Sequence, residues 1–139
     1  MNQLVMEGEA LPGIRDKHCI AGIGETVYSR ASHRTTRSMG VEAVTRAMTD
    51  AGLGPEDVDG LLSYHRDDST PAAVIAEDLG IRPNFHMDCT GGGSSIEALI
   101  GLAVGAIEAG MCQTVAIFRS MNGHSGRRPG GSPTADRPA

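Results

Sequence analysis

The chain has 139 residues, a net charge of −5 and 40% hydrophobic residues, which suits one globular domain with its own core. Aromatic residues make up only 3%, and no basic stripe with interleaved aromatics is present, so the composition argues against nucleic-acid binding. The three cysteines are scattered, which predicts a protein of the reducing cytoplasm without disulfides. The N-terminus lacks the apolar stretch of a secretory leader, and no apolar run reaches the roughly 20 residues of a membrane span, so neither feature is predicted.

The first half of the chain predicts two strands joined by a helix. Residues 1–17 are polar and predict a poorly ordered lead-in, after which the apolar run 18–24, stopped by glycine, predicts a buried strand. Apolar residues then recur at helical spacing from about Thr36 until Gly52, which predicts a helix. The apolar run 60–65 predicts the second strand.

The second half repeats the alternation. Pro71 predicts the start of a short helix that ends at Gly80, and residues 84–88 predict a third strand. A run of glycines then leads into a helix over 95–109 and a fourth strand over 114–118. We expect residues 18–119 to form the domain, and the Gly/Pro/Arg-rich stretch 120–139 to be a loop and disordered tail.

The predicted order β-α-β-α-β-α-β defines the fold class as α/β. Short strands that alternate with helices favour a parallel sheet with right-handed crossovers. Ligands of such sheets bind beyond the carboxyl ends of the strands. We therefore expect the functional edge to carry all three strand-to-helix loops.

The helix predicted over 95–109 is apolar on nearly every side. Its only charges are Glu97 and Glu108, which predicts burial all round. Its small residues fall in one row: Ala98, Gly101, Gly105 and Ala109. Because glycine costs about 1 kcal/mol relative to alanine inside a helix, this row predicts close approach by another backbone. The other predicted elements are too few to cover this helix, so part of its packing partner is expected to lie outside the chain.

The turn 88–95 precedes that helix and carries the main candidate site. Free N–H groups at a helix N-terminus favour negative charge, such as a thiolate, an enolate or a thioester oxyanion. Glycines also let a substrate approach the backbone closely. Local physics equally allows a structural turn without chemistry.

Several stretches resemble the lipid-transfer, sterol-carrier-type thiolases. They are the opening run 20–30, the pair Glu42-Ala43, the helix-to-strand connection 51–61, and the helix and strand over 103–119. The resemblance covers about residues 14–128 and implies the N-terminal part of a two-halved thiolase fold. The C-terminal half of that family, with its catalytic His and second Cys, has no match in this chain, so activity of the chain alone is left open.

The nucleophile signature of the family is only partly matched. Ser94, Ser95 and Ala98 align with its Ser, Gly and Ala, whereas the position of the nucleophilic Cys falls on Gly92. Gly92 cannot carry an acyl group. Cys89, three residues earlier, becomes the catalytic candidate if the alignment slips, and the alternative is that it is a small buried hydrophobe.

A branch of the family without the Cys, the thiolase-like aldolases of steroid side-chain degradation, fits the glycines best. That resemblance implies retro-aldol cleavage of a β-hydroxyacyl-CoA, with the CoA thioester as substrate, no other cofactor, and a homodimer or an OB-fold partner subunit. The alternatives are an inactive truncated paralogue or binding module, and an acyltransferase that uses Cys89. The predicted substrate-binding residues are Gly91, Gly92, Gly93, Ser94, Arg119 and Asn122.

Other candidates carry weaker signals. No two His residues fall at metal-ligand spacing, and no CxxC pair exists. The pair Asp67 and Asp68 could bind a metal, but a solvated loop is the favoured interpretation. His65 and His86 are expected at or near the carboxyl ends of strands, most simply in structural or solvated roles. Ser125, Arg127 and Arg128 join Arg119 and Asn122 as candidates for CoA phosphate contacts, with a solvated tail as the alternative. The run 22–28 begins like a dinucleotide-binding loop but lacks its third glycine, which argues against a Rossmann site.

Overall fold

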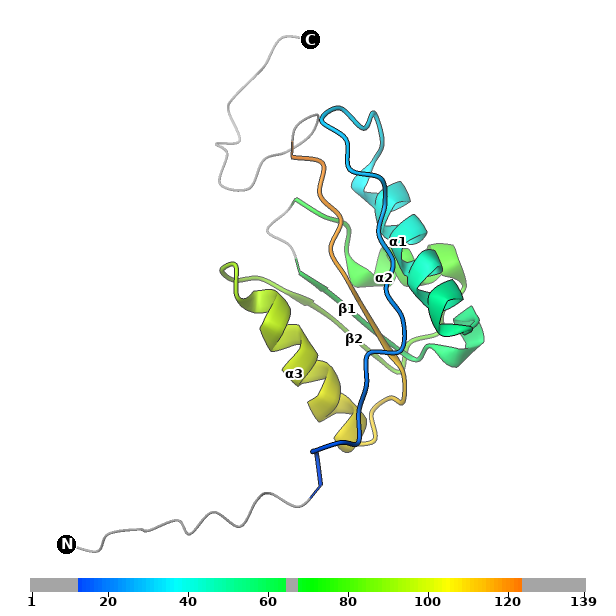
Figure 1. Cartoon of the computed structure of the whole chain (residues 1–139), viewed down its shortest axis with the longest axis vertical. Coiled ribbons are helices and arrows are strands. Elements are labelled where there is room, and N and C mark those ends of the chain that lie inside the picture. The colour runs from blue at the N-terminus through cyan, green and yellow to red at the C-terminus, as the bar shows by residue number, and fades with distance from the viewer. Residues whose placement is uncertain (1–12, 65–67, 124–139) are drawn as a thin grey trace, which may run out of the picture.

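A computed structural model describes residues 13–64 and 68–123 of the chain. It contains a parallel sheet of three strands in the order β2-β1-β3, where β1 is Gly60–Tyr64, β2 is Phe85–Cys89 and β3 is Val115–Phe118. Helices α1 (Thr36–Ala51) and α2 (Ala72–Leu79) lie on one face, and α3 (Ser95–Glu108) lies on the other (Figure 1). The predicted α/β class with a parallel sheet is confirmed.

The helices on the first face begin and end where the sequence places them. Thr35 accepts a hydrogen bond from the backbone N–H of Ser38 at the start of α1. Gly52 and Gly80 end α1 and α2 with φ near 70°, the left-handed conformation that glycine adopts without a steric penalty. A short 3₁₀ turn, Pro55–Asp57, then leads into β1.

Strand β1 is the centre of the molecule, and all five of its residues are buried. Its side chains alternate between two clusters: Leu61 joins the core under α1 and α2 together with Val44, Ile75 and Phe118. Leu62 and Tyr64 pack against Leu99 and Ala103 of α3 on the opposite face. A strand buried on both faces is typical of a parallel sheet covered by helices.

The strand predicted over 18–24 is wrong. Residues 18–29 are extended but pair with none of the described strands, and their glycines lie directly on α1. A Cβ at Gly24 would lie 2.2 Å from the carbonyl oxygen of Ala43, and one at Gly22 would lie 2.4 Å from that of Ala47. The glycines therefore serve a close approach of backbone to helix, whereas the sequence pattern indicated a sheet.

Helix α3 is covered on one side only. Leu99, Ala103 and Ala106 are its buried residues, while Ile100 is 45% exposed. A Cβ built at Gly101 or Gly105 would meet no described atom within 4 Å. Burial all round is thus not achieved by the described residues, in line with the expectation that its small-residue face requires a further partner.

Parts of the predicted lead-in and tail lie outside the described residues. These are 1–12 of the lead-in 1–17 and 124–139 of the tail 120–139, and residues 65–67 after β1 also lie outside. Within the described ranges, no helix is long and apolar enough to cross a membrane.

Candidate functional site

The carboxyl ends of all three strands meet at one edge of the sheet. Tyr64 ends β1, Cys89 ends β2 in register with it, and Phe118 ends β3 beside Ser63. The loops that follow contain most of the residues that the sequence singled out. The candidate site therefore lies at this edge of the sheet, where the parallel topology predicts ligand binding.

The glycine turn joins β2 to the N-terminus of α3. Ser94 is the N-cap residue, but its side chain makes no capping hydrogen bond, and the N–H of Ser95 bonds to the carbonyl oxygen of Gly92. A Cβ at Gly92 or Gly93 would meet nothing within 4 Å, whereas one at Gly91 would meet the Ser95 hydroxyl at 2.3 Å. The turn thus offers backbone N–H donors beside open space, with a helix dipole behind them.

Tyr64 connects the glycine turn to β1. Its hydroxyl donates a hydrogen bond of 2.9 Å to the carbonyl oxygen of Gly91, and the guanidinium of Arg119 lies 4.2 Å from the centre of its ring. Arg119 in turn bonds to Asp68 at 3.0 Å, and the Asp68 side chain is 1% exposed. One chain of contacts therefore ties together the loops that follow all three strands.

Arg119 is held within the site. Asp68 and Tyr64 hold its guanidinium, while its Nε is buried without a hydrogen-bond partner among the described residues. Asp68 is 4% exposed, so the expectation of a solvated loop at 67–68 is wrong for Asp68; Asp67 is outside the described residues. Burial of a carboxylate requires such a partner because an unpaired charge inside a protein is costly.

Asp88 joins β1, β2 and α2. Its carboxylate accepts hydrogen bonds from the Ser63 hydroxyl and from the backbone N–H of Ala72 at 2.7 Å. The second bond satisfies a donor in the first turn of α2, where negative charge is favourable. Asp88 therefore fixes the strand end from which the glycine turn starts.

Asn122 connects the site to the stretch that precedes α1. Its amide oxygen accepts a 3.1 Å hydrogen bond from Ser32, and its amide nitrogen donates to the carbonyl oxygen of Arg34. Two residues earlier, Ser120 bonds to Ser69 through both its N–H and its hydroxyl. Residues 119–122 are thus pinned to neighbouring loops, whereas the predicted contacts at Ser125, Arg127 and Arg128 lie outside the described residues.

Cys89 lies at the end of β2 and is only partly buried. It packs against the apolar cluster of Leu62, Tyr64, Leu99 and Ala103. This environment is that of a small hydrophobic residue, although the thiol is next to the glycine turn. Its predicted catalytic role stays a prediction.

The two histidine candidates, His86 and His65, are not found among the described residues at this edge. His86 is the second residue of β2, pairs with Leu61 and is exposed near the amino-terminal half of the strand, so its expected place near the carboxyl end is wrong. His65 is outside the described residues. No group of three or more His, Cys, Asp or Glu side chains in the described ranges is arranged to hold a metal.

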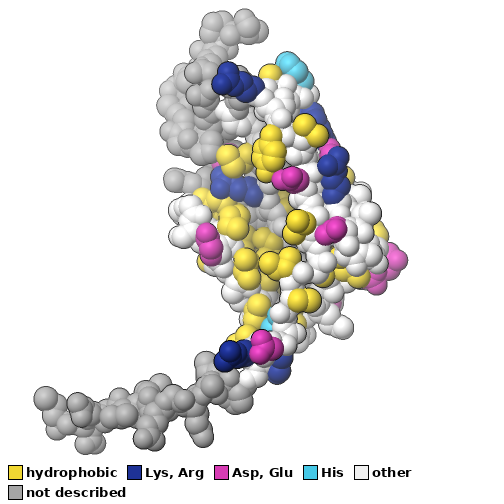
Figure 2. Space-filling model, viewed as in Figure 1, with side chains coloured by type: hydrophobic (Ala, Val, Ile, Leu, Met, Phe, Trp, Pro, Cys, Tyr) yellow, Lys and Arg dark blue, Asp and Glu magenta, His cyan; other side chains and the backbone are white. Residues whose placement is uncertain are grey.

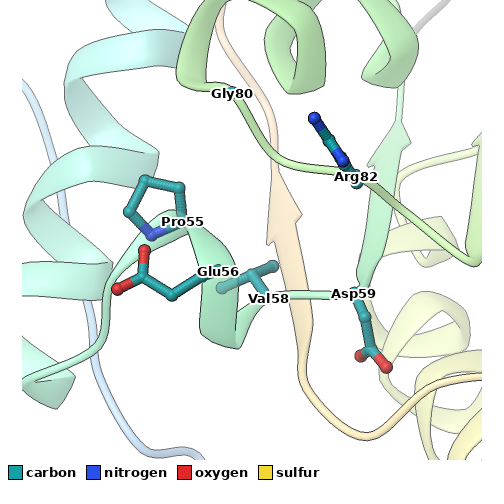
Figure 3. A pocket seen from close by; sticks show the side chains of 6 residues that line it. All are labelled: Pro55, Glu56, Val58, Asp59, Gly80 and Arg82. Atoms are coloured by element: carbon teal, nitrogen blue, oxygen red, sulfur yellow. The ribbon is translucent and has the colours of Figure 1, made fainter.

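A surface hollow of about 360 Å³ lies at the opposite edge of the sheet, where β1 begins. Figure 3 shows its lining, in which the side chain of Asp59 points away from that of Arg82. Burial raises the pKa of Asp59, but hydrogen bonds from the N–H groups of Thr114 and Gln113 outweigh it and leave that pKa below its ordinary value. Asp59 therefore fixes the start of β3 beside β1, far from the glycine turn.

Sequence reasoning overlooked Tyr64, Asp68 and Asp88 as residues that organise the edge. A tyrosine at the last position of a buried strand is a usable signal, because its hydroxyl has to find a partner. The pairing of Asp68 with Arg119 was invisible, since the two residues are 51 positions apart in the chain.

Comparisons with known proteins place this geometry in a family. The chain is 38% identical over 112 residues to a 17-hydroxy-3-oxo-4-pregnene-20-carboxyl-CoA lyase of Mycobacterium tuberculosis. The matched region covers 80% of the chain and 29% of that protein. It is 37% identical over 121 residues to a steroid side-chain-cleaving aldolase of Thermomonospora curvata, covering 86% of the chain and 30% of the relative. No family model matches.

Solved structures of related proteins also resemble this chain. An Ltp2-ChsH2(DUF35) aldolase superposes with a TM-score of 0.73 at 34% identity, over 84% of this chain and 30% of the solved one. A monomeric SCP2-thiolase-like protein of Mycobacterium smegmatis shares the fold, with a TM-score of 0.63 at 23% identity over 74% of this chain and 23% of that protein.

The parallel sheet, the glycine turn and these matches define the class: the chain has the fold of the N-terminal part of thiolase-like proteins. Its homologues include the steroid side-chain-cleaving aldolases. The chain spans about 30% of the length of these relatives. The expected family and fold are therefore confirmed.

Proposed function

We propose that this chain forms the thioester-binding part of a thiolase-like aldolase that cleaves a C–C bond in a β-hydroxyacyl-CoA derived from a steroid or another lipid. The observation that carries the proposal is the open, uncapped turn at Gly92 and Gly93, at the carboxyl edge of the sheet. Homologues named as a CoA lyase and as side-chain-cleaving aldolases support the same chemistry.

The turn suits noncovalent stabilisation of a developing negative charge. In retro-aldol cleavage the β-hydroxyl loses its proton to a base and becomes a carbonyl as the bond between the α and β carbons breaks. The electron pair of that bond leaves an enolate on the thioester, with negative charge on its oxygen, until the α carbon takes up a proton. Preorganised backbone N–H donors at a helix N-terminus lower the energy of such an oxyanion. Gly92 has no side chain that could form an acyl-enzyme, so the turn binds the thioester without a covalent bond.

Arg119 and Asn122, in the loop that follows β3, are proposed to bind the substrate. Both are already held by protein contacts, which fixes their positions before a ligand arrives. A preorganised guanidinium suits a phosphate or carboxylate because its donors lie in one plane. The acid and base of the reaction are not assigned to residues of this chain.

Two further features of the proposal concern the assembly and its location. One solved homologue is a complex of two components, Ltp2 and ChsH2(DUF35), which supports a partner subunit here. We propose that this chain works in such an assembly, with an OB-fold subunit or a second copy, in the cytoplasm.

Substitution at Gly92 tests the proposal. Because a Cβ at Gly92 meets no atom within 4 Å and its φ is not left-handed, Gly92→Val is expected to leave the fold intact. The branched side chain would fill the space that the thioester needs. We expect binding of a β-hydroxyacyl-CoA, measured by isothermal titration calorimetry, to weaken by at least about tenfold, the equivalent of roughly 1.4 kcal/mol.

Gly101→Ala is the matched control, since Gly101 is equally open but lies in the middle of α3. It should leave binding unchanged. Unaltered affinity in Gly92→Val, or no CoA-ester binding by the chain at all, would refute the proposal. Loss of thiolytic activity in Cys89→Ser would instead support the acyltransferase alternative.

A further inference from the structure

The glycine turn holds two backbone N–H groups, those of Gly92 and Gly93, that donate to no acceptor among the described residues. The space around both glycines is open, since a Cβ built at either would meet no described atom within 4 Å. Figure 2 shows the turn, at the upper end of α3, as white surface of backbone and small polar side chains at the rim of the molecule. What these two donors bind depends on the direction in which their peptide groups are turned.

The glycines by themselves do not set that direction. The run from Gly91 to Gly93 has no side chain that could pack against the protein, and glycine has the most permissive backbone of all residues. A peptide group between two glycines therefore turns over at little cost unless one of its polar atoms is held. The direction of each N–H in the turn has to be fixed by a hydrogen bond to the carbonyl group of the same peptide.

The peptide between Gly92 and Gly93 is held locally. The carbonyl oxygen of Gly92 accepts a 3.1 Å hydrogen bond from the N–H of Ser95, at the start of α3. The C=O and N–H groups of a trans peptide point in opposite directions. This bond therefore directs the N–H of Gly93 away from the first turn of the helix.

The peptide between Gly91 and Gly92 is held from another strand. The hydroxyl of Tyr64, the last residue of β1, donates a 2.9 Å hydrogen bond to the carbonyl oxygen of Gly91. Among the described residues, this is the bond that fixes that carbonyl group. By the same trans geometry, the N–H of Gly92 points away from Tyr64 and toward the open side of the turn.

Tyr64 is itself firmly placed. It is 4% exposed, and its backbone pairs in register with Cys89 of β2. Its ring packs in the apolar cluster with Leu99 and Ala103, and the guanidinium of Arg119 lies 4.2 Å from the ring centre. The position of its hydroxyl is therefore set before a ligand arrives. A buried tyrosine whose hydroxyl is bonded to the turn acts on a ligand through the turn.

We infer that Tyr64 is a positioning residue of the thioester site: its hydroxyl turns the Gly91–Gly92 peptide so that the N–H of Gly92 faces the oxygen on which the enolate charge develops. The inference rests on the proposed function, because that function supplies the oxygen. It adds that one donor of the turn is aimed from β1, through a hydroxyl that neither α3 nor the glycines provide. Aim matters because a donor stabilises an oxyanion only when it is already directed at the developing charge.

Amide order parameters from NMR relaxation of the isotopically labelled full chain test the positioning without any ligand. In the unaltered chain, the N–H of Gly92 should be as rigid as regular backbone, with an order parameter near 0.85 on the usual scale, where mobile amides fall below about 0.6. Tyr64→Phe keeps the buried ring and removes only the hydroxyl. We expect its Gly92 amide to become mobile, while that of Gly101 in α3 stays rigid. A mobile Gly92 in the unaltered chain, or a rigid one in Tyr64→Phe, would overturn the inference.

Two CoA compounds test what the aimed donor binds. One is a neutral β-hydroxyacyl-CoA, and the other is a nitronate analogue of an acyl-CoA, whose charged oxygen copies that of the enolate. We expect Tyr64→Phe to weaken binding of the nitronate by at least about tenfold, short of the roughly 100-fold to 1,000-fold effect of removing an oxyanion donor outright. The neutral ester should lose no more than about threefold, because a neutral acceptor forms the weaker hydrogen bond.

Thr36→Val is the matched control. It also removes one hydroxyl, which shares a 2.9 Å hydrogen bond with the hydroxyl of Thr70, and it keeps a branched side chain. It should leave the Gly92 order parameter and both affinities unchanged. Equal losses for the two compounds in Tyr64→Phe would indicate a merely structural role and overturn the inference. If the unaltered chain bound neither compound, the proposed function would fail, and the order parameters would still decide whether Tyr64 fixes the turn.

Discussion

At the scale of single residues, the edge of the sheet is organised by side chains that reach between loops. Tyr64 bonds to the glycine turn, Arg119 stacks on Tyr64, and Asp68 neutralises Arg119. Each of these three contacts joins segments that are distant in the chain. The glycine turn therefore depends for its position on residues that belong to other strands.

Asp59 plays a comparable role at the opposite edge. Its carboxylate accepts 2.8 Å and 2.9 Å hydrogen bonds from the N–H groups of Gln113 and Thr114. Burial opposes ionisation, yet these bonds keep the pKa of Asp59 below its ordinary value. Burial and the charge of Asp59 raise the pKa of the neighbouring Cys112 thiol.

Asp59→Asn is expected to destabilise the chain by about 1 kcal/mol at neutral pH, because the amide oxygen can still accept both hydrogen bonds but no longer carries the charge that strengthens them. A carboxyl group whose pKa is lower in the folded state stabilises the fold above its unfolded pKa, near 3.9. That contribution disappears as the pH falls through the folded value. Urea unfolding at several pH values should show the difference from the parent shrinking below about pH 4; a difference independent of pH would contradict the assignment.

At the scale of elements, α3 combines a covered face with an open one. Leu99 and Ala103 pack on the sheet, while Gly101 and Gly105 meet no described atoms. The cost of glycine in this helix is therefore not offset by packing within the described residues. The helix is suited to a backbone that approaches its small-residue face.

Gly105→Ala should stabilise the isolated chain by about 0.5–1 kcal/mol, because alanine is the better helix former and the space is open. Gly52→Ala is the control: it has equally open space but a φ of 70°, so it should destabilise by about 1 kcal/mol. Chemical denaturation measures both. Destabilisation by Gly105→Ala would show that the face is already covered in the isolated chain.

At the scale of the whole molecule, the chain presents apolar surface on two elements. In the extended stretch 18–28, four apolar side chains are 75–87% exposed: Ile20, Ile23, Val27 and Tyr28. Helix α3 adds its open small-residue face. Exposed apolar groups contribute nothing to the stability of the isolated fold. The molecule thus has a buried core around β1, and apolar side chains remain exposed on its surface.

The purified chain is therefore expected to be a poorly stable monomer that melts below the range of about 45–65 °C typical of mesophilic domains. Size-exclusion chromatography and thermal melting followed by circular dichroism test this. A compact monomer with a cooperative transition inside that range would contradict the expectation.

The sequence by itself determined the helices, three of the strands and the family. Caps and left-handed glycines are local, so Thr35, Gly52 and Gly80 mark helix ends without any knowledge of the fold. The glycine turn before α3 was visible for the same reason. Only the tertiary structure decided that residues 18–28 lie on α1 outside the sheet, because an extended backbone becomes a strand only when a partner pairs with it. It alone also brought Asp68, Arg119 and Tyr64 together at the glycine turn, since contacts across 27 or more positions depend on which strands are neighbours.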